Sequence, residues 1–181
     1  MKASIVAITF VLLGAPALAE TDTFSDRGDG AKVHVSGFVC PQKIGEFERD
    51  SVGEADPEMK SDFCAYGAVG GVYGTIRLTP LAGAYDPKSA FLGDFVVQEA
   101  TGGKRIAEKP IKLDTPPLTI YTRTYSTARA EALEYRILFA GAAVKGWAVE
   151  ATVEYADPRD VQTEADFLHA VYGAAVRQIL K

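Results

Sequence analysis

The stretch that decides the fold is residues 63–80, which read FCAYGAVGGVYGTIRLTP. Two runs rich in apolar, aromatic and β-branched residues flank the pair Gly70-Gly71. Such a pair tolerates positive φ at both central positions of a tight type I′ turn. Residues 63–80 therefore predict a β-hairpin with a two-residue loop.

That loop predicts the register of the hairpin. On the apolar face it pairs Val69 with Val72, Gly67 with Gly74, Ala65 with Ile76 and Phe63 with Leu78. The other face then carries Tyr66, Tyr73, Thr75 and Arg77, with Cys64 opposite Arg77. A slip of one residue would exchange the two faces. We expect Gly67 and Gly74 to leave a dent on the apolar face, which a helix side chain fills or, alternatively, a small ligand occupies.

The N-terminus has the pattern of a cleavable secretory signal peptide. Lys2 is followed by an apolar run over residues 5–13, and Ala17-Leu18-Ala19 has the small-x-small form of a cleavage site. We expect cleavage after Ala19, a flexible arm at residues 20–30 and a single α+β domain at residues 31–181. The mature chain then has no membrane span.

The net charge and the composition indicate which partners and which cellular compartment to expect. Without Lys2 the chain carries 18 basic and 24 acidic residues, a net charge of −6, which argues against nucleic acid as a partner. The chain contains no asparagine and much alanine, a bias typical of GC-rich bacterial genomes. A bacterial secretory protein of this size is expected to be a periplasmic monomer.

The cysteine count is two, Cys40 and Cys64. A lone pair in an oxidising compartment predicts one disulfide, and the spacing matches no redox or metal motif. That disulfide is expected to pin an acidic loop at residues 53–62.

Alternation of apolar and polar residues predicts most of the sheet. Strands are expected at residues 32–39, 44–52, 105–113, 118–125, 133–140 and 147–155, besides the hairpin. Pro110 places the strand at 105–113 on an edge or at a bulge. In the first strand, Val33 and Val35 share one face and His34 lies on the wet face. A loop at residues 141–146 would set Arg136 opposite Glu150.

Two helices are predicted. Asp86-Pro87 is typical of a helix start, and the helix runs to about Ala100 before Gly102-Gly103. The second helix spans residues 161–180, with a wide apolar face that must pack on a sheet. His169 lies away from the centre of that face, as a surface histidine.

The chain lacks the motifs of familiar catalytic and metal sites. It has no His-x-x-x-His pair, no Gly-x-Ser-x-Gly elbow and no phosphate-binding glycine loop, so we expect neither a cofactor nor a metal. One set of side chains suits a binding surface, because tyrosine and arginine bury area while offering hydrogen bonds. The candidate binding residues are Tyr66, Tyr73, Arg77, Tyr121, Arg123 and Arg136.

The order of these elements resembles the Mog1/PsbP-like fold. The resemblance is carried by Gly146-Trp147, the strand that runs from them to Tyr155, the following Asp157-Pro158 and the helix from Val161. It implies an antiparallel, twisted sheet of about six or seven strands flanked by helices, an α/β/α sandwich. It also implies a binding or accessory role, with no shared catalytic residues to carry over.

Three functions remain open from the sequence. The favoured one is a non-catalytic periplasmic accessory or binding protein, which meets a protein or cell-envelope component through its Tyr/Arg face or an exposed loop. A small periplasmic hydrolase would instead need a concave pocket with two unpaired carboxylates. A small-ligand carrier would need an open apolar cavity at the Gly67/Gly74 dent.

Overall fold

The computed structural model describes residues 23–68, 71–114, 117–128, 134–156 and 161–179. The predicted signal peptide at residues 1–19 lies outside these residues. An eight-stranded antiparallel sheet dominates the fold, in the spatial order β4-β5-β6-β7-β11-β10-β9-β8. Its strands are β4 Lys43–Ile44, β5 Phe47–Asp56, β6 Ser61–Ala68, β7 Val72–Pro80, β8 Lys104–Asp114, β9 Pro117–Ala128, β10 Glu134–Val144 and β11 Trp147–Ala156.

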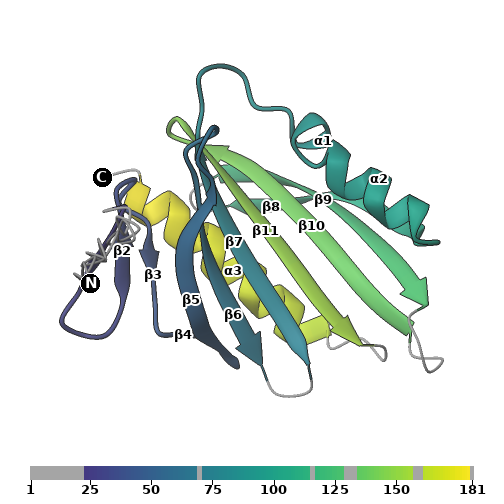
Figure 1. Ribbon diagram of the computed structural model, residues 1–181, viewed down its shortest axis with the longest axis horizontal. Helices are drawn as coiled ribbons and strands as arrows, with labels where there is room; N and C mark the ends of the chain where they lie inside the picture. The colour runs from purple at the N-terminus through teal and green to yellow at the C-terminus, as the bar shows by residue number, and fades with distance from the viewer. Residues whose placement is uncertain (1–22, 69–70, 115–116, 129–133, 157–160, 180–181) are drawn as a thin grey trace, which may run out of the picture.

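A second sheet of three short strands lies beside the first (Figure 1). Its strands are β1 Phe24–Asp26, β2 Lys32–His34 and β3 Val39–Cys40, all antiparallel. The described part of the expected flexible arm at residues 20–30 thus contains a strand paired with β2. The number of strands exceeds the predicted six or seven because residues 24–56 form five strands, β1 to β5, divided between two sheets.

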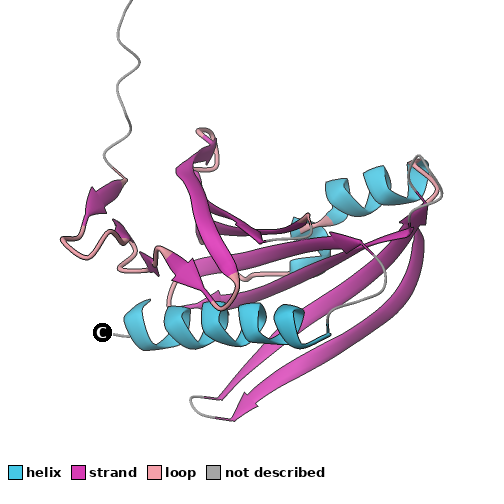
Figure 2. Ribbon diagram, turned by 90° about the horizontal axis from the view of Figure 1, so that it is seen from below, coloured by secondary structure: helices cyan, strands magenta, loops and turns pink. Residues whose placement is uncertain are grey.

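Helices lie on both faces of the main sheet (Figure 2). One face carries α3, Val161–Ile179, and the other carries α1, Pro87–Ala90, followed by α2, Leu92–Ala100. The Asp86 side chain accepts the Lys88 N–H and caps α1, as predicted. The antiparallel sheet flanked by helices is confirmed, although the predicted first helix is split at Phe91.

Two apolar clusters fill the space under the helices. Beneath α3, the buried helix residues Phe167, Leu168, Val171, Tyr172 and Ala175 meet the sheet and the small β3–β4 segment. On the opposite face, Phe91 and Phe95 pack on Tyr125, Ile137 and Phe139. His169 is exposed, as expected from its place on α3.

The register expected for the central hairpin is wrong by one residue. Ala68 pairs with Val72, Tyr66 with Gly74 and Cys64 with Ile76, so residues 69–71 separate the strands. Gly71 has a φ of 77°, as suits a three-residue hairpin loop with glycine in the left-handed region. Consequently Cys64 and Tyr66 face α3, whereas Phe63, Ala65 and Gly67 face the other way.

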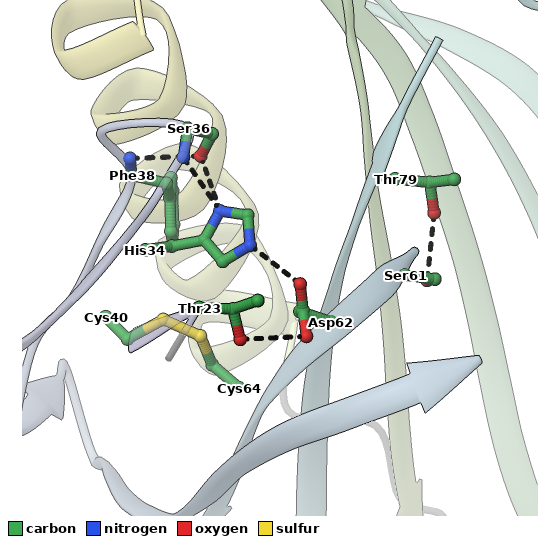
Figure 3. A network of polar contacts seen from close by, with 9 residues as sticks. All are labelled: Thr23, His34, Ser36, Phe38, Cys40, Ser61, Asp62, Cys64 and Thr79. Atoms are coloured by element: carbon green, nitrogen blue, oxygen red, sulfur yellow. Dashed lines mark hydrogen bonds and ion pairs between the residues drawn. A yellow bond between two sulfur atoms is a disulfide. The ribbon is translucent and has the colours of Figure 1, made fainter. Parts of the chain in front are cut away.

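The disulfide is confirmed between Cys40 at the end of β3 and Cys64 in β6. It ties the small sheet to the main one (Figure 3). The acidic loop expected at residues 53–62 is wrong, because β5 continues to Asp56 and β6 begins at Ser61.

Two further expectations concern the later strands. The predicted loop at residues 141–146 is a two-residue turn, in which Lys145 and Gly146 have φ of 41° and 81°. Arg136 therefore pairs with Tyr155, not with Glu150, and Glu150 lies between Gly141 and Arg77. Pro110 does lie on an edge strand, β8, and a bulge separates Arg105 from Ala107.

Candidate functional site

The six candidate binding residues lie on two faces of the main sheet. Tyr73, Arg77, Tyr121 and Arg123 share the face of α1 and α2, whereas Tyr66 and Arg136 alternate onto the face of α3. Tyr66 is on the α3 face because of the one-residue change in hairpin register. The structure therefore does not bring all six together.

Tyr66 is a core residue. It is 1% exposed, its hydroxyl donates to the Pro41 carbonyl over 3.0 Å, and its ring lies edge-on to Phe167. Burial raises the pKa of its hydroxyl far above the ordinary value. Arg136, on β10, is half-buried on the α3 face and lies opposite Tyr155.

Arg77 belongs to a polar cluster on the α1 face that also includes Tyr85 and Glu150, here called the Glu150 cluster. The Arg77 Nε donates to Glu150 Oε2 over 2.6 Å, and the Tyr85 hydroxyl donates to Glu150 Oε1 over 3.0 Å. Glu150 is 4% exposed, so both oxygens of a buried carboxylate are satisfied. Burial raises the pKa of Tyr85 strongly, and the neighbouring carboxylate adds to the effect, so Tyr85 remains a donor.

Gly141, which lies on β10 opposite Glu150, explains how Tyr85 reaches this cluster. A Cβ atom built on Gly141 would lie 2.3 Å from the Tyr85 hydroxyl oxygen and 3.1 Å from Phe91. Gly141 therefore leaves the room that Tyr85 and Phe91 occupy. Sequence reasoning missed Tyr85 and the role of Glu150. The signals were a glycine inside a strand, Gly141, and a glutamate, Glu150, flanked by the apolar residues Val149 and Ala151.

Hollows open on both sides of Tyr85. One of about 370 Å³ is lined by Arg77, Glu150, Tyr85 and Met59, among others. The other, of about 560 Å³, lies toward Tyr121 and Lys88. Arg77 and Tyr121 thus lie on opposite sides of the α1 segment.

Arg123 holds α1 and α2 to the sheet. Its guanidinium lies 3.9 Å from the centre of the Phe95 ring and donates to Glu108 over 3.0 Å. Lys88 of α1 contacts the same carboxylate at 2.7 Å. These two cations lower the pKa of Glu108, with the Lys88 hydrogen bond as the larger cause. Only 11% of the Arg123 side chain is exposed, so it serves the fold more than a binding surface.

A second polar group joins the small sheet to β6 (Figure 3). His34 Nε2 lies 3.0 Å from Asp62, and its Nδ1 lies 2.8 Å from the Ser36 hydroxyl. The Ser36 backbone N–H also donates to Nδ1, so the neutral imidazole carries its proton on Nε2 and donates to Asp62. Thr23 donates to the other Asp62 oxygen.

The expectation of a solvated His34 is wrong. His34 is 1% exposed and stands edge-on to Trp147, whereas Val35 is 65% exposed. The cause is a tight turn, in which the His34 N–H bonds to the Phe38 carbonyl and ends the alternation of β2.

The side chains of Ser36, His34 and Asp62 are those of a Ser-His-Asp hydrolytic triad, but the serine lies within a turn. Ser36 accepts the Phe38 N–H over 3.2 Å and closes the turn. Its hydroxyl is thereby engaged within the turn rather than presented to a substrate pocket. These hydrogen bonds hold the small sheet against β6.

Among the described residues, no three His, Cys, Asp or Glu side chains gather as metal ligands. No helix in that part of the chain has the length and apolar character needed to cross a bilayer. No protein-family model matches the chain, and no curated protein does.

Proposed function

We propose that this protein is a non-catalytic binding or accessory protein of the bacterial periplasm, which engages a protein or cell-envelope component through the exposed part of its α1/α2 face. One observation carries the proposal: two carboxylates on this face, Glu150 and Glu108, are each held by an arginine. A carboxylate paired in this way is a poor general base or nucleophile. The disulfide supports an oxidising compartment.

The binding surface is proposed around Arg77. Its Nε is committed to Glu150, whereas its two terminal nitrogens have no partner within the described part of the chain. A guanidinium held in place at one end presents its remaining N–H groups without losing much side-chain entropy. Tyr73 lies on the same face of β7 and is 62% exposed. Because the two residues lie about 13 Å apart along the strand, they suit a partner that offers a carboxylate or phosphate at one point and an apolar or aromatic group about that distance away.

The carrier function based on the glycine dent is not proposed. A Cβ atom on Gly74 would lie 2.6 Å from the Phe167 ring, so the dent already receives a helix side chain. Gly67 faces the opposite side of the sheet in the observed register.

Capture from periplasmic extract tests the binding proposal. The full sequence is expressed in a bacterium with a periplasm, and the protein recovered there is immobilised and compared with the variant Tyr73→Ala/Arg77→Gln/Glu150→Gln. Replacing Arg77 and Glu150 together leaves no unpaired buried charge. We expect wild type to retain specific partners that the triple variant loses. Lys43→Gln, at an exposed site on β4, is the matched control. Identical capture by wild type and the triple variant would contradict the proposal.

A further inference from the structure

A cavity lies between α3 and the β8–β10 side of the main sheet, away from the Glu150 cluster. Its volume is about 160 Å³. Its apolar wall comes from β8, β9, β10 and α3, through Ala107, Ile111, Ile120, Leu138, Ala165 and Leu168. An apolar cavity of about 150 Å³ in another protein is known to stay dry and to accept benzene. This volume is therefore sufficient for one small apolar molecule.

The cavity results from the position of the helix and from small side chains. On this face α3 packs mainly on β10, β11 and the small β3–β4 segment, so β8 and β9 extend beyond it (Figure 2). Ala107 on the sheet side and Ala165 on the helix side are too short to close the gap that remains. Close packing would need larger residues at these two positions.

Most polar groups in the wall of the cavity already form hydrogen bonds within the protein. The Thr122 hydroxyl donates to the Lys109 carbonyl over 2.6 Å, and the Tyr155 hydroxyl donates to the Glu164 carboxylate. Exposed Lys109 and His169 lie at the rim. An anion would have to leave water beside the Glu164 carboxylate, and a cation would find that carboxylate already bonded to Tyr155, so burying either charge is costly. The wall thus favours an uncharged ligand.

We propose that this cavity is a binding site for a small, uncharged, apolar molecule of about the size of benzene. The proposal does not depend on the partner-binding function of the opposite face. It assigns to the α3 side of the sheet a separate ligand site.

The test is titration of the protein with benzene, followed through the side-chain methyl signals in ¹H–¹³C NMR spectra. We expect saturable shifts for Ile120, Leu138 and Leu168, and no comparable shifts for methyl groups on the α2 side. Ala165→Leu fills the cavity from the helix and is expected to weaken binding at least tenfold. Ala100→Leu makes the same change at an exposed position on α2 and is expected to leave binding unchanged.

A second cavity-filling variant and two charged ligands complete the test. If Ala165→Leu does not fold, Ala107→Leu fills the cavity from the sheet and must give the same loss. Hexanoate and hexylamine test the ligand class, because they carry opposite charges, and both are expected to bind more weakly than benzene. Absence of saturable shifts at the three methyl groups, equal binding by the filled variants, or tighter binding of either ion would overturn the proposal.

Discussion

The ring of Phe167 on α3 occupies the space directly above Gly74 on β7. A Cβ atom on Gly74 would lie 2.6 Å from Cζ and 2.7 Å from Cε2 of that ring. The centre of the same ring lies 4.6 Å from that of Phe47, at an angle of 48°, and the ring meets Tyr66 edge-on. A glycine in the central hairpin therefore sets how closely the C-terminal helix approaches the sheet.

Gly74→Ala is expected to destabilise the protein by about 1–3 kcal/mol, because the new methyl group overlaps a ring that is itself confined by the core. Urea unfolding followed by circular dichroism measures the loss. Gly67→Ala is the control, since its Cβ atom would meet nothing within 4 Å. In a Phe167→Leu background the cost of Gly74→Ala should fall by about 1 kcal/mol. Equal costs in both backgrounds would contradict the steric explanation.

The buried His34 makes stability depend on pH. Burial lowers the pKa of His34 below its ordinary value of 6.5, despite the opposing effect of Asp62. The unfolded chain thus binds a proton more readily than the folded one. The free energy of unfolding should fall as pH decreases below about 6.5, until the folded-state pKa is passed, with a slope of at most about 1.4 kcal/mol per pH unit for this one proton.

Urea titrations of wild type and His34→Gln between pH 7.5 and about 5 measure this dependence. The variant should lack the part of the slope that His34 contributes. His169→Gln, at an exposed position on α3, is the matched control and should keep the wild-type slope. Parallel curves for wild type and His34→Gln would show that His34 does not carry the effect.

Loss of the disulfide should be costly because it closes a loop with a sequence separation of 24 residues. The chain-entropy relation gives about 3.5 kcal/mol for a loop of this length. Cys40→Ala/Cys64→Ala is therefore expected to unfold at a lower urea concentration. Adding a reductant should lower the midpoint of wild type but leave that of the variant unchanged. A reductant effect on the variant would point to some other cause.

Removing the charge of Arg77 alone should lower the free energy of unfolding more than removing the charges of Arg77 and Glu150 together. Arg77→Met leaves a buried carboxylate with Tyr85 as its remaining donor, and we expect a loss of about 1–2 kcal/mol, since 35% of the Arg77 side chain is exposed. Arg77→Met/Glu150→Gln should recover most of that loss. Urea unfolding of the two variants provides the comparison, and an additive result would show that the pair is not coupled.

Much of the sheet could be predicted because alternation over long strands is a strong signal. The strands around residues 118–125 and 147–155 occur where expected, although each extends further. The Asp86-Pro87 helix start and the edge position of Pro110 were also predictable, since each depends on local backbone chemistry. The apolar face of α3 followed from its helical periodicity.

Other features depended on distant contacts that no local pattern contains. Both faces of the central hairpin carry apolar or glycine residues, so its sequence did not discriminate between two registers one residue apart. The bond from Cys64 to Cys40 and the packing of Phe167 on Gly74 accompany the observed register. His34 was misplaced because its partner, Asp62, lies 28 residues away. Tyr85 joined the candidate site from a loop without regular alternation.

The main sheet consists of two four-stranded meanders, β4–β7 and β8–β11, which meet where β7 pairs with β11. Within each meander, neighbouring strands follow one another in sequence, but the β7–β11 pairing joins Pro80 to Trp147. Contacts between such distant segments close slowly, because a long loop must first lose its conformational freedom. As the chain emerges from its N-terminus, the second edge of β7 therefore stays unpaired until β11 has emerged, and during that interval it can pair with other chains.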